Sequence, residues 1–576
     1  MSLDLSYFQL RANLYPREEK QAVKFKLSEL EPIWFCNRKN VKIKLRKLEG
    51  ERKFIYEPGR GRGHLSKLNF FSSFQKDVEE FVQLCLKQER LEDIVQLMQL
   101  PLPLSWIAKV SIEVQKLFGF QSINQEKDIL RTMVPRKVTT LDPLYSSINF
   151  DNYLIQQLGD TLVRYDPRME SILPHLAFHW KEEENSTKWT FYLRKGVYFH
   201  HQRTLTSEDV KYTFERFQQA DSHLDWLVEN ILSIECVSPY ILLIKLEKPN
   251  PFFLRYMSSA NLSILPKDEP VEDNKWIGTG PFQLKKCTDR IVVLEAFDHY
   301  FLERPFLDEI EFYLVPSETP DAMNYLIKGK EEPNSVLQKE DVISGFRFIA
   351  FNFQRQSIVH KYLFRTALYH VLDVQKMKED LGREDILEAS SFFPYKSKPQ
   401  RKERQLIPKL LANAGYQGEM LTFYAANFSH LKDKVEWFVK EASEFGIHLK
   451  LVYFDMSEYY SKAIDENADL LMMGEVSSVD PHLSFLDAFY NKALIFRRFF
   501  LEKDLQYIEE CLNQFKYESD RDKREAWIEK VEHYLRENYL ILFQQHQIKQ
   551  RSFHEKIQDV RFDSYGYDDF RNSWID

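Results

Sequence analysis

The sequence predicts a multidomain protein of mixed α+β and α/β class, with a small winged helix-turn-helix head followed by a large α/β body. The chain has 576 residues, which is too long for a single hydrophobic core. Basic side chains gather in one short segment near the N-terminus, although the whole chain carries a formal charge of −8. Beyond residue 121, strand-like and helix-like patterns alternate. We expect a head over 1–75, a helical connector over 76–120 and a body over 121–576.

The composition is that of a globular protein. Hydrophobic residues make up 44% and charged residues 29% of the chain, which excludes the disordered, collagen-like and coiled-coil classes. No apolar run approaches the roughly 18 residues that a membrane span needs. Residues 1–20 lack the pattern of a secretory signal, and the five cysteines are scattered without a CxxC pair. We therefore expect a cytoplasmic protein with reduced thiols and no membrane partner.

The basic segment over residues 36–67 has eleven Lys or Arg and three acidic side chains. It opens with a predicted helix, because Asn37 is a good N-cap, Gly50 is a good stop, and apolar residues recur at i, i+4 and i+7 (Val41, Leu45 and Leu48). The residues off this stripe should face solvent. We expect these to contact DNA: Arg38, Lys39, Asn40, Lys42 and Arg46.

Two further features complete a winged helix. Ser28 and Glu31 form a capping-box pattern that predicts an earlier helix, which ends near Phe35. After the basic helix, residues 54–56 and 65–70 read as strands joined by a glycine-rich tip. Arg60 and Arg62 project from this tip, so we expect them to contact the DNA backbone or minor groove. The apolar helical pattern over 74–100 is interpreted as a connector.

Short motifs in the body occur in the order of a known family. Residues 193–217 read LRKGVYFHHQRTLTSEDVKYTFERF, residues 278–282 read GTGPF, and residues 411–416 read LANAGY. These segments resemble the extracytoplasmic solute-binding proteins of the oligopeptide, dipeptide and nickel class. The resemblance implies a two-lobed body of the periplasmic-binding-protein type, with a ligand cleft between the lobes.

A winged helix fused to such a body resembles the SgrR family of bacterial transcriptional regulators, over essentially the whole chain. The resemblance implies a cytoplasmic regulator that binds double-stranded DNA and senses a small molecule. It places the first lobe at about 121–345 and 505–576, the second lobe at about 346–504, and a hinge around 349–353.

The resemblance also suggests ligand-binding residues. Oligopeptide binders carry a Trp and, three positions later, an Asp that anchors the ligand's amine, but here Glu475 and Ser478 stand at those positions. Asp480 could replace the lost carboxylate, or it could cap a turn before Pro481. We expect a sugar, sugar phosphate, peptide or amine to be contacted by some of five residues: Tyr145, Asn352, Glu475, Ser478 and Asp480.

Two other function classes fit the sequence less well. A solute-binding accessory protein of an ABC transporter for peptides or sugars is the alternative, but it would need export or a lipid-attachment cysteine, and the first cysteine is Cys36. An enzyme is not expected, because the sequence has no GxSxG, P-loop or HExxH pattern. We likewise expect no cofactor and no metal ion.

Overall fold

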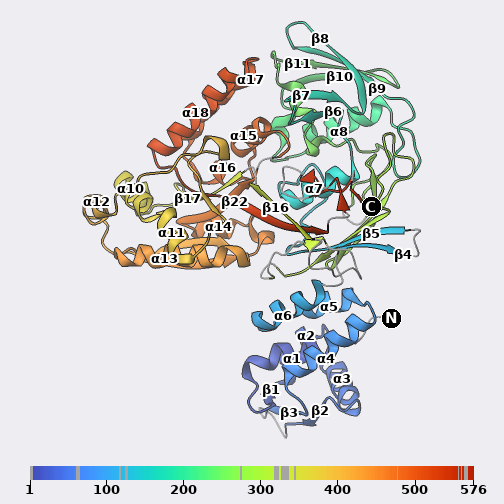
Figure 1. The fold of residues 1–576 in the computed structure, drawn as a ribbon, viewed down its shortest axis with the longest axis vertical. Helices are drawn as coiled ribbons and strands as arrows, with labels where there is room; N and C mark the ends of the chain where they lie inside the picture. The colour runs from blue at the N-terminus through green and yellow to red at the C-terminus, as the bar shows by residue number, and fades with distance from the viewer. Residues whose placement is uncertain are drawn as a thin grey trace.

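The computed structural model shows a small N-terminal unit below a larger two-lobed body (Figure 1). The structure describes residues 4–59, 65–115, 119–123, 127–272, 275–316, 319, 324–325, 336–342, 345–476, 478–554, 557–559, 561–562, 568–571 and 573–575. None of the helices in this part of the chain is long and apolar enough to cross a membrane.

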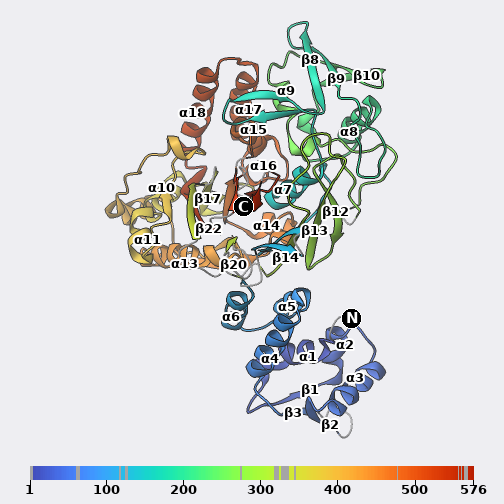
Figure 2. The ribbon, with the colours of Figure 1, turned by 45° about the vertical axis from the view of Figure 1, so that its right-hand side comes forward.

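The N-terminal unit is a winged helix with additional helices. Its antiparallel sheet has three strands in the order β1-β3-β2. Figure 2 shows this sheet at the end of the unit farthest from the body. The elements are α1 (Ser6–Leu14), β1 (Ala22–Phe25), α2 (Leu27–Ile33), α3 (Arg38–Gly50), β2 (Phe54–Glu57), β3 (Ser66–Phe70), α4 (Phe74–Lys87), α5 (Leu91–Met98) and α6 (Leu104–Gln115).

The basic helix α3 is confirmed. The Asn37 side chain caps it by accepting from the Asn40 backbone N–H at 3.0 Å. The predicted apolar stripe is buried in the core. The cap predicted for the preceding helix was wrong by two residues, because α2 begins after Lys26, whose backbone N–H donates to the Glu29 carboxylate at 2.8 Å, in place of a box formed by Ser28 and Glu31. Helix α1 had not been predicted.

Helix α4 belongs to the core of the head. Arg11 of α1 is fully buried and pairs with Glu18 and with Asp77 of α4, each at 2.7 Å. A buried guanidinium requires such partners, so α4 is held against the head by charge as well as by apolar packing. The head therefore extends beyond the boundary predicted at residue 75, which falls inside α4.

The head core continues into the body. Buried residues of α4–α6 share one apolar cluster with five side chains of the body sheet: Met133, Ile291, Val293, Tyr313 and Val315. Polar contacts reinforce this junction, since Lys286 pairs with Glu92 of α5 at 2.5 Å. The predicted connector is thus a packed layer between the head and the body.

The first lobe holds two main sheets. One has five strands in the order β12-β13-β14-β5-β4, and the other has four in the order β10-β11-β9-β8. The elements are β4 (Gly119–Ile123), β5 (Lys127–Val134), α7 (Asn149–Leu158), β6 (Val163–Asp166), β7 (Ser171–Pro174), β8 (Ala177–Glu183), β9 (Lys188–Leu193), α8 (Ser207–Gln219), β10 (Ile231–Ser238), β11 (Ile241–Leu246), α9 (Phe253–Tyr256), β12 (Phe282–Cys287), β13 (Ile291–Ala296) and β14 (Glu309–Leu314).

The second lobe is built on a sheet whose main path runs β15-β22-β17-β21-β19-β20. Its elements are β15 (Asn324–Tyr325), β16 (Val336–Val342), β17 (Gly345–Phe351), α10 (Tyr362–Val371), α11 (Val374–Leu381), β18 (Ile386–Glu388), α12 (Ile407–Ala414), β19 (Leu421–Ala426), α13 (Ser429–Glu444), β20 (Leu449–Phe454), α14 (Lys462–Asn467), β21 (Leu470–Val476), α15 (Pro481–Tyr490), α16 (Ile495–Phe499), α17 (Glu502–Tyr517), α18 (Arg521–Glu537) and β22 (Ile541–His554).

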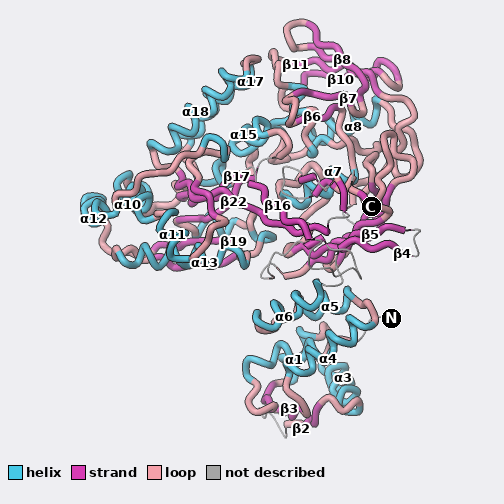
Figure 3. The backbone as a smooth tube through the Cα atoms, viewed as in Figure 1, coloured by secondary structure: helices cyan, strands magenta, loops and turns pink. Residues whose placement is uncertain are grey.

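Strand β22 connects the lobes. Its first part pairs with β17 inside the second lobe, and its last part pairs with β15 and β16, which lead toward the first-lobe sheet. Figure 3 shows this long strand passing between the two lobes. The chain therefore leaves the second lobe along β22, later than the position near residue 505 that the resemblance implied. Short strand pairs follow near the C-terminus: β23 (Ile557–Gln558) with β26 (Trp574–Ile575), and β24 (Arg561–Phe562) with β25 (Asp568–Asp569).

Candidate functional site

Helix α3 presents a basic surface to solvent. The side chains predicted to contact DNA all lie on its exposed face: Arg38, Lys39, Asn40, Lys42 and Arg46. None of the four basic ones forms an ion pair with a residue in the described part of the chain, whereas Lys47 pairs with Asp4 at 2.7 Å. Because unpaired cations on one helix face attract a polyanion, this surface is suited to the phosphate backbone and major groove of DNA. The wing residues Arg60 and Arg62 lie outside the described residues.

A cavity of about 1430 Å³ lies between the two lobes of the body. Helix α7 supplies part of its first-lobe wall, because Asn149, Asn152 and Gln156 are spaced so that they share one helix face. The end of α7 is fixed by Gly280, whose backbone N–H donates to Leu158 O at 3.0 Å. A Cβ atom at Gly280 would collide with the α7 backbone, so the GTGPF turn positions this wall.

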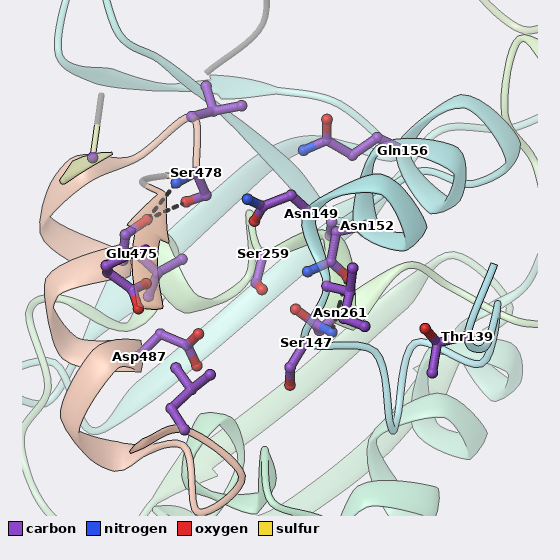
Figure 4. A pocket seen from close by; sticks show the side chains of 18 of the residues that line it. Thr139, Ser147, Asn149, Asn152, Gln156, Ser259, Asn261, Glu475, Ser478 and Asp487 are labelled. Carbon is purple, nitrogen blue, oxygen red and sulfur yellow. Dashed lines mark hydrogen bonds between the residues drawn. The ribbon is translucent and has the colours of Figure 1, made fainter. Parts of the chain in front are cut away.

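The amide and hydroxyl groups of the first-lobe wall are uncharged. Ser147, Ser259 and Asn261 stand beside the α7 asparagines in Figure 4. The Asn261 amide donates to Pro143 O and Ser146 O, both at 2.8 Å, and so holds the loop before α7. This wall can offer hydrogen bonds to hydroxyl, carbonyl or amide groups of a ligand.

Among the carboxyl groups of the second-lobe wall, Glu475 at the end of β21 and Asp487 on α15 form a pair. Figure 4 shows both on one wall, facing the serine and asparagine side chains of the first lobe. Burial raises the pKa of Glu475, and the nearby Asp487 carboxyl raises it further. Burial also raises the pKa of Asp487, to about 7. Charged side chains of both signs line other parts of the cavity, among them Arg136, Arg164 and Arg347, but at this place a pair of carboxyl groups faces uncharged amide and hydroxyl groups.

Asp480 is structural, although it reaches the cavity. Its carboxylate caps α15 by accepting from the backbone N–H groups of His482 and Leu483 at 3.0 and 3.1 Å. It also forms a two-bond ion pair with Arg255 of the first lobe. The Arg255 guanidinium lies 4.3 Å from the ring centre of Tyr165. Asp480 thus joins the two lobes, and its oxygens are already engaged.

Of the other predicted ligand residues, some line the cavity and others do not. Ser478 lines the cavity, and its backbone N–H and hydroxyl group both contact Ser484. Asn352 does not line it, because its amide donates to Asp465 O and Ala468 O and its oxygen accepts from the Gln354 N–H. Tyr145 is 45% exposed and lies outside the cavity wall. Glu475 and Ser478 are thus the predicted residues left facing the cavity with a possible ligand role.

Sequence reasoning missed most of the cavity wall. The spacing of Asn149, Asn152 and Gln156 on one face of a helix was an available signal, since polar residues on a buried helix face need a partner. Asp487 had no such signal, because it stands in an apolar helix and meets Glu475 only through the fold.

The head also reaches the cavity. Gln99, which ends helix α5, lines it, and its amide donates to Asp289 O at 3.0 Å and to Leu314 O at 3.4 Å. These two carbonyls belong to the turn before β13 and to the end of β14. Gln99 therefore belongs to the head, contacts the body sheet and lines the cavity.

Comparisons with known families match both parts of the chain. The family described as bacterial extracellular solute-binding proteins, family 5 Middle, matches residues 171–495. The family described as sugar transport-related sRNA regulator N-term matches residues 5–113.

Individual relatives agree with these matches. The chain is 30% identical to the uncharacterized protein YhjP of Bacillus subtilis over 80% of each chain. It is 23% identical to the HTH-type transcriptional regulator SgrR of Yersinia enterocolitica over 95% of each. Among solved structures, it is similar to a Pseudoalteromonas dipeptide binding protein in complex with Met-Leu, at 18% identity and a TM-score of 0.68 over 78% of this chain and 100% of that one. Helicobacter pylori DppA in complex with the peptide STSA gives a TM-score of 0.67 at 19% identity, over 81% and 99%.

Proposed function

The chain belongs to the family 5 bacterial solute-binding proteins and to the SgrR regulators, and we propose that it controls transcription by changing its DNA affinity when a small polar molecule fills the cavity. The head binds DNA and the body senses the ligand. This family is one of binding proteins and regulators rather than of enzymes. Because its target is DNA, we place its action in the cytoplasm.

The contact of Gln99 with the cavity supports this proposal. A ligand can change DNA affinity only if it binds the two states of the protein differently. The side chain of Gln99 and the shared core of α4–α6 with the body sheet offer a direct physical route for that difference. A shift of β13 or β14 on ligand binding would move α5 and the head with it.

The transporter-accessory alternative fits these features less well. A solute-binding accessory protein has no use for the unpaired basic face of α3, which carries Lys42 and Arg46. Nor would it need a core that continues from a winged helix into the body sheet. Both features are accounted for if the same chain binds DNA and a small molecule.

Genome-wide DNA occupancy of the full-length protein tests the function. We expect discrete binding sites for the unaltered protein and their loss in the double variant Lys42→Ala, Arg46→Ala. Lys409→Ala, an exposed lysine of the second lobe, is the control and should leave the sites unchanged. Uniform occupancy by the unaltered protein, or sites that survive the double substitution, would contradict the proposal.

Hydrogen exchange tests the coupling, because coupling between two sites is reciprocal. Adding a DNA fragment recovered from those sites should change the exchange of backbone amides near Leu314. In Gln99→Ala the fragment should still bind, while this remote change becomes smaller. An unaltered response in Gln99→Ala would show that the coupling takes another route.

A further inference from the structure

In one part of the cavity, a pair of carboxyl groups on the second lobe faces uncharged amide and hydroxyl groups on the first lobe. We propose that the cavity binds a small primary amine that also carries hydroxyl or carbonyl oxygens, with its ammonium group held between Glu475 and Asp487. This inference rests on the proposed ligand-sensing function and names the class of ligand.

The carboxyl pair formed by Glu475 and Asp487 has no ion-pair partner among the described residues. The hydrogen-bond donors beside Asp487 are neutral: the amide of Asn491, at 3.5 Å, and the indole of Trp226. Two other acidic side chains between the lobes do have cationic partners: Asp480 pairs with Arg255, and Asp225 pairs with Lys492 at 2.7 Å. Two adjacent carboxyl groups with no cation, facing a cavity, form a site that an ammonium group would complete.

The pKa shifts of the two carboxyl groups agree with this geometry. Burial favours the protonated form of both carboxyl groups and so raises both pKa values, and the Asp487 carboxyl raises the pKa of Glu475 further. A bound ammonium would reverse that effect, since an opposite charge within about 4–6 Å favours the ionised carboxylate. The affinity for a cation should therefore be greatest where Asp487 is already ionised, above its pKa of about 7.

The opposite wall requires that the ligand also accept hydrogen bonds. Asn152 is 9% exposed, and Figure 4 shows it among the polar side chains that line the cavity. Its oxygen lies 3.5 Å from the Asn261 amide, but no acceptor for its own N–H groups occurs in the described part of the chain. These N–H groups are open to the cavity, where an oxygen atom of the ligand would accept from them. Asn149 and Gln156 extend the same polar face.

This site differs from the amine anchor of the oligopeptide binders. Ser478 stands where that family places its aspartate, and its hydroxyl group is occupied by Ser484 at 2.7 Å. The negative charge is instead supplied by a strand residue three positions earlier and by a helix residue nine positions later. A long peptide is not required, because the groups that the ligand must satisfy lie on two facing walls of one cavity.

A divalent cation is the other ligand that two carboxylates could attract. Calcium needs about six to eight oxygen ligands and magnesium about six in a strict octahedron. Within the described residues, no group of three or more His, Cys, Asp or Glu side chains is placed to hold a metal ion. An ammonium group needs only two or three acceptors, which matches what Glu475 and Asp487 provide.

Matched ligand pairs test the inference on the full-length protein at pH 8. Serinol and glycerol differ only in an amine for a hydroxyl, as do D-glucosamine and D-glucose. By isothermal titration calorimetry, we expect at least one amine to bind at least 10-fold more tightly than its neutral partner. Equal binding of both members of each pair, or no binding by either amine at 10 mM, would overturn the inference. Calcium chloride binding more tightly than both amines would overturn it as well.

Two variants locate the ammonium group. Glu475→Gln and Asp487→Asn keep the shape of the wall and resemble its protonated form, so both should fold, and each should weaken amine binding at least 10-fold. Glu303→Gln, an exposed carboxyl at the rim of the same cavity, is the matched control and should bind as the unaltered protein does. Full amine affinity in both wall variants would show that the assignment is wrong. DNA occupancy does not depend on this outcome, so the proposed function would still stand or fall by its own test.

Discussion

The DNA-binding surface and the ligand cavity are built in opposite ways. The basic face of α3 comes from nine consecutive residues, Arg38–Arg46, and needs only one capped helix to exist. The cavity is assembled from segments as distant as Gln99, Asn152 and Asp487, and it exists only when both lobes and the junction with the head are in place. The basic face of α3 should keep its shape when other parts of the chain move. The cavity should change its shape when the lobes or the head move. That sensitivity is what a sensor needs.

Breaking the bridge between the lobes should have the largest effect. Asp480→Ala leaves the buried Arg255 guanidinium without its carboxylate and removes the cap of α15. Loss of one partner of a buried ion pair costs about 3–5 kcal/mol, so we expect the free energy of unfolding of the body to fall by that amount. Asp480→Asn keeps an acceptor for the cap and should cost less. Urea denaturation measures both, and equal stability of Asp480→Ala and the unaltered protein would refute the structural role.

Removing the charge of the head should have a large but purely local effect. In the variant with alanine at residues 38, 39, 42 and 46, we expect DNA affinity at 150 mM salt to fall about 100-fold or more. The affinity should also depend less on salt, because each lost phosphate contact lowers the slope of log affinity against log salt concentration by about 0.9. Fluorescence anisotropy across a salt series measures both quantities. The melting temperature of the body should not change. A shift in that temperature would show that the basic face is not independent of the body.

The carboxyl pair should make stability depend on pH. Folding raises the pKa of Asp487 from 3.8 to about 7, so its contribution to stability is present below about pH 4 and is lost as the pH rises through 7. Glu475 and Tyr460 face the same carboxyl group, and no basic residue that the structure describes compensates for it. Asp487→Asn should match the unaltered protein near pH 4 and exceed its stability by about 1–2 kcal/mol at pH 8, after allowance for solvent in the cavity. Thermal melts at the two pH values decide this, with Glu303→Gln as a variant expected to show no such difference.

The smallest effect is expected at the cap of the basic helix. Asn37→Ala removes the acceptor for the Asn40 N–H and should cost about 1 kcal/mol of head stability. Because the cavity is remote from this cap, ligand affinity measured by calorimetry should not change. A loss of amine binding in Asn37→Ala would mean that the two regions are more tightly coupled than their construction suggests.

The same contrast explains what could be predicted from sequence. Helix α3 was predicted to its first residue because caps and an i, i+4, i+7 stripe are local signals. Glu475 was found through its departure from a family motif. Asn352 was predicted to contact the ligand, but its side chain forms hydrogen bonds within the lobe. A polar residue beside a hinge strand can do either, and the sequence does not distinguish the two. Asp487 and Gln99 were not predicted at all, since their partners are supplied by segments far away in the sequence.

Strand β22 also limits how this body could have been divided during evolution. Its first part fills the place between β17 and the strands that lead to the other lobe. A gene fragment ending near residue 504 would therefore encode a second lobe with β17 as an open sheet edge, and such edges promote aggregation. Recombination that exchanges one lobe for another must carry two separate stretches of gene together. The head is a continuous N-terminal stretch, but it shares an apolar core with the body sheet, so a replacement head would have to present a matching apolar surface to that sheet.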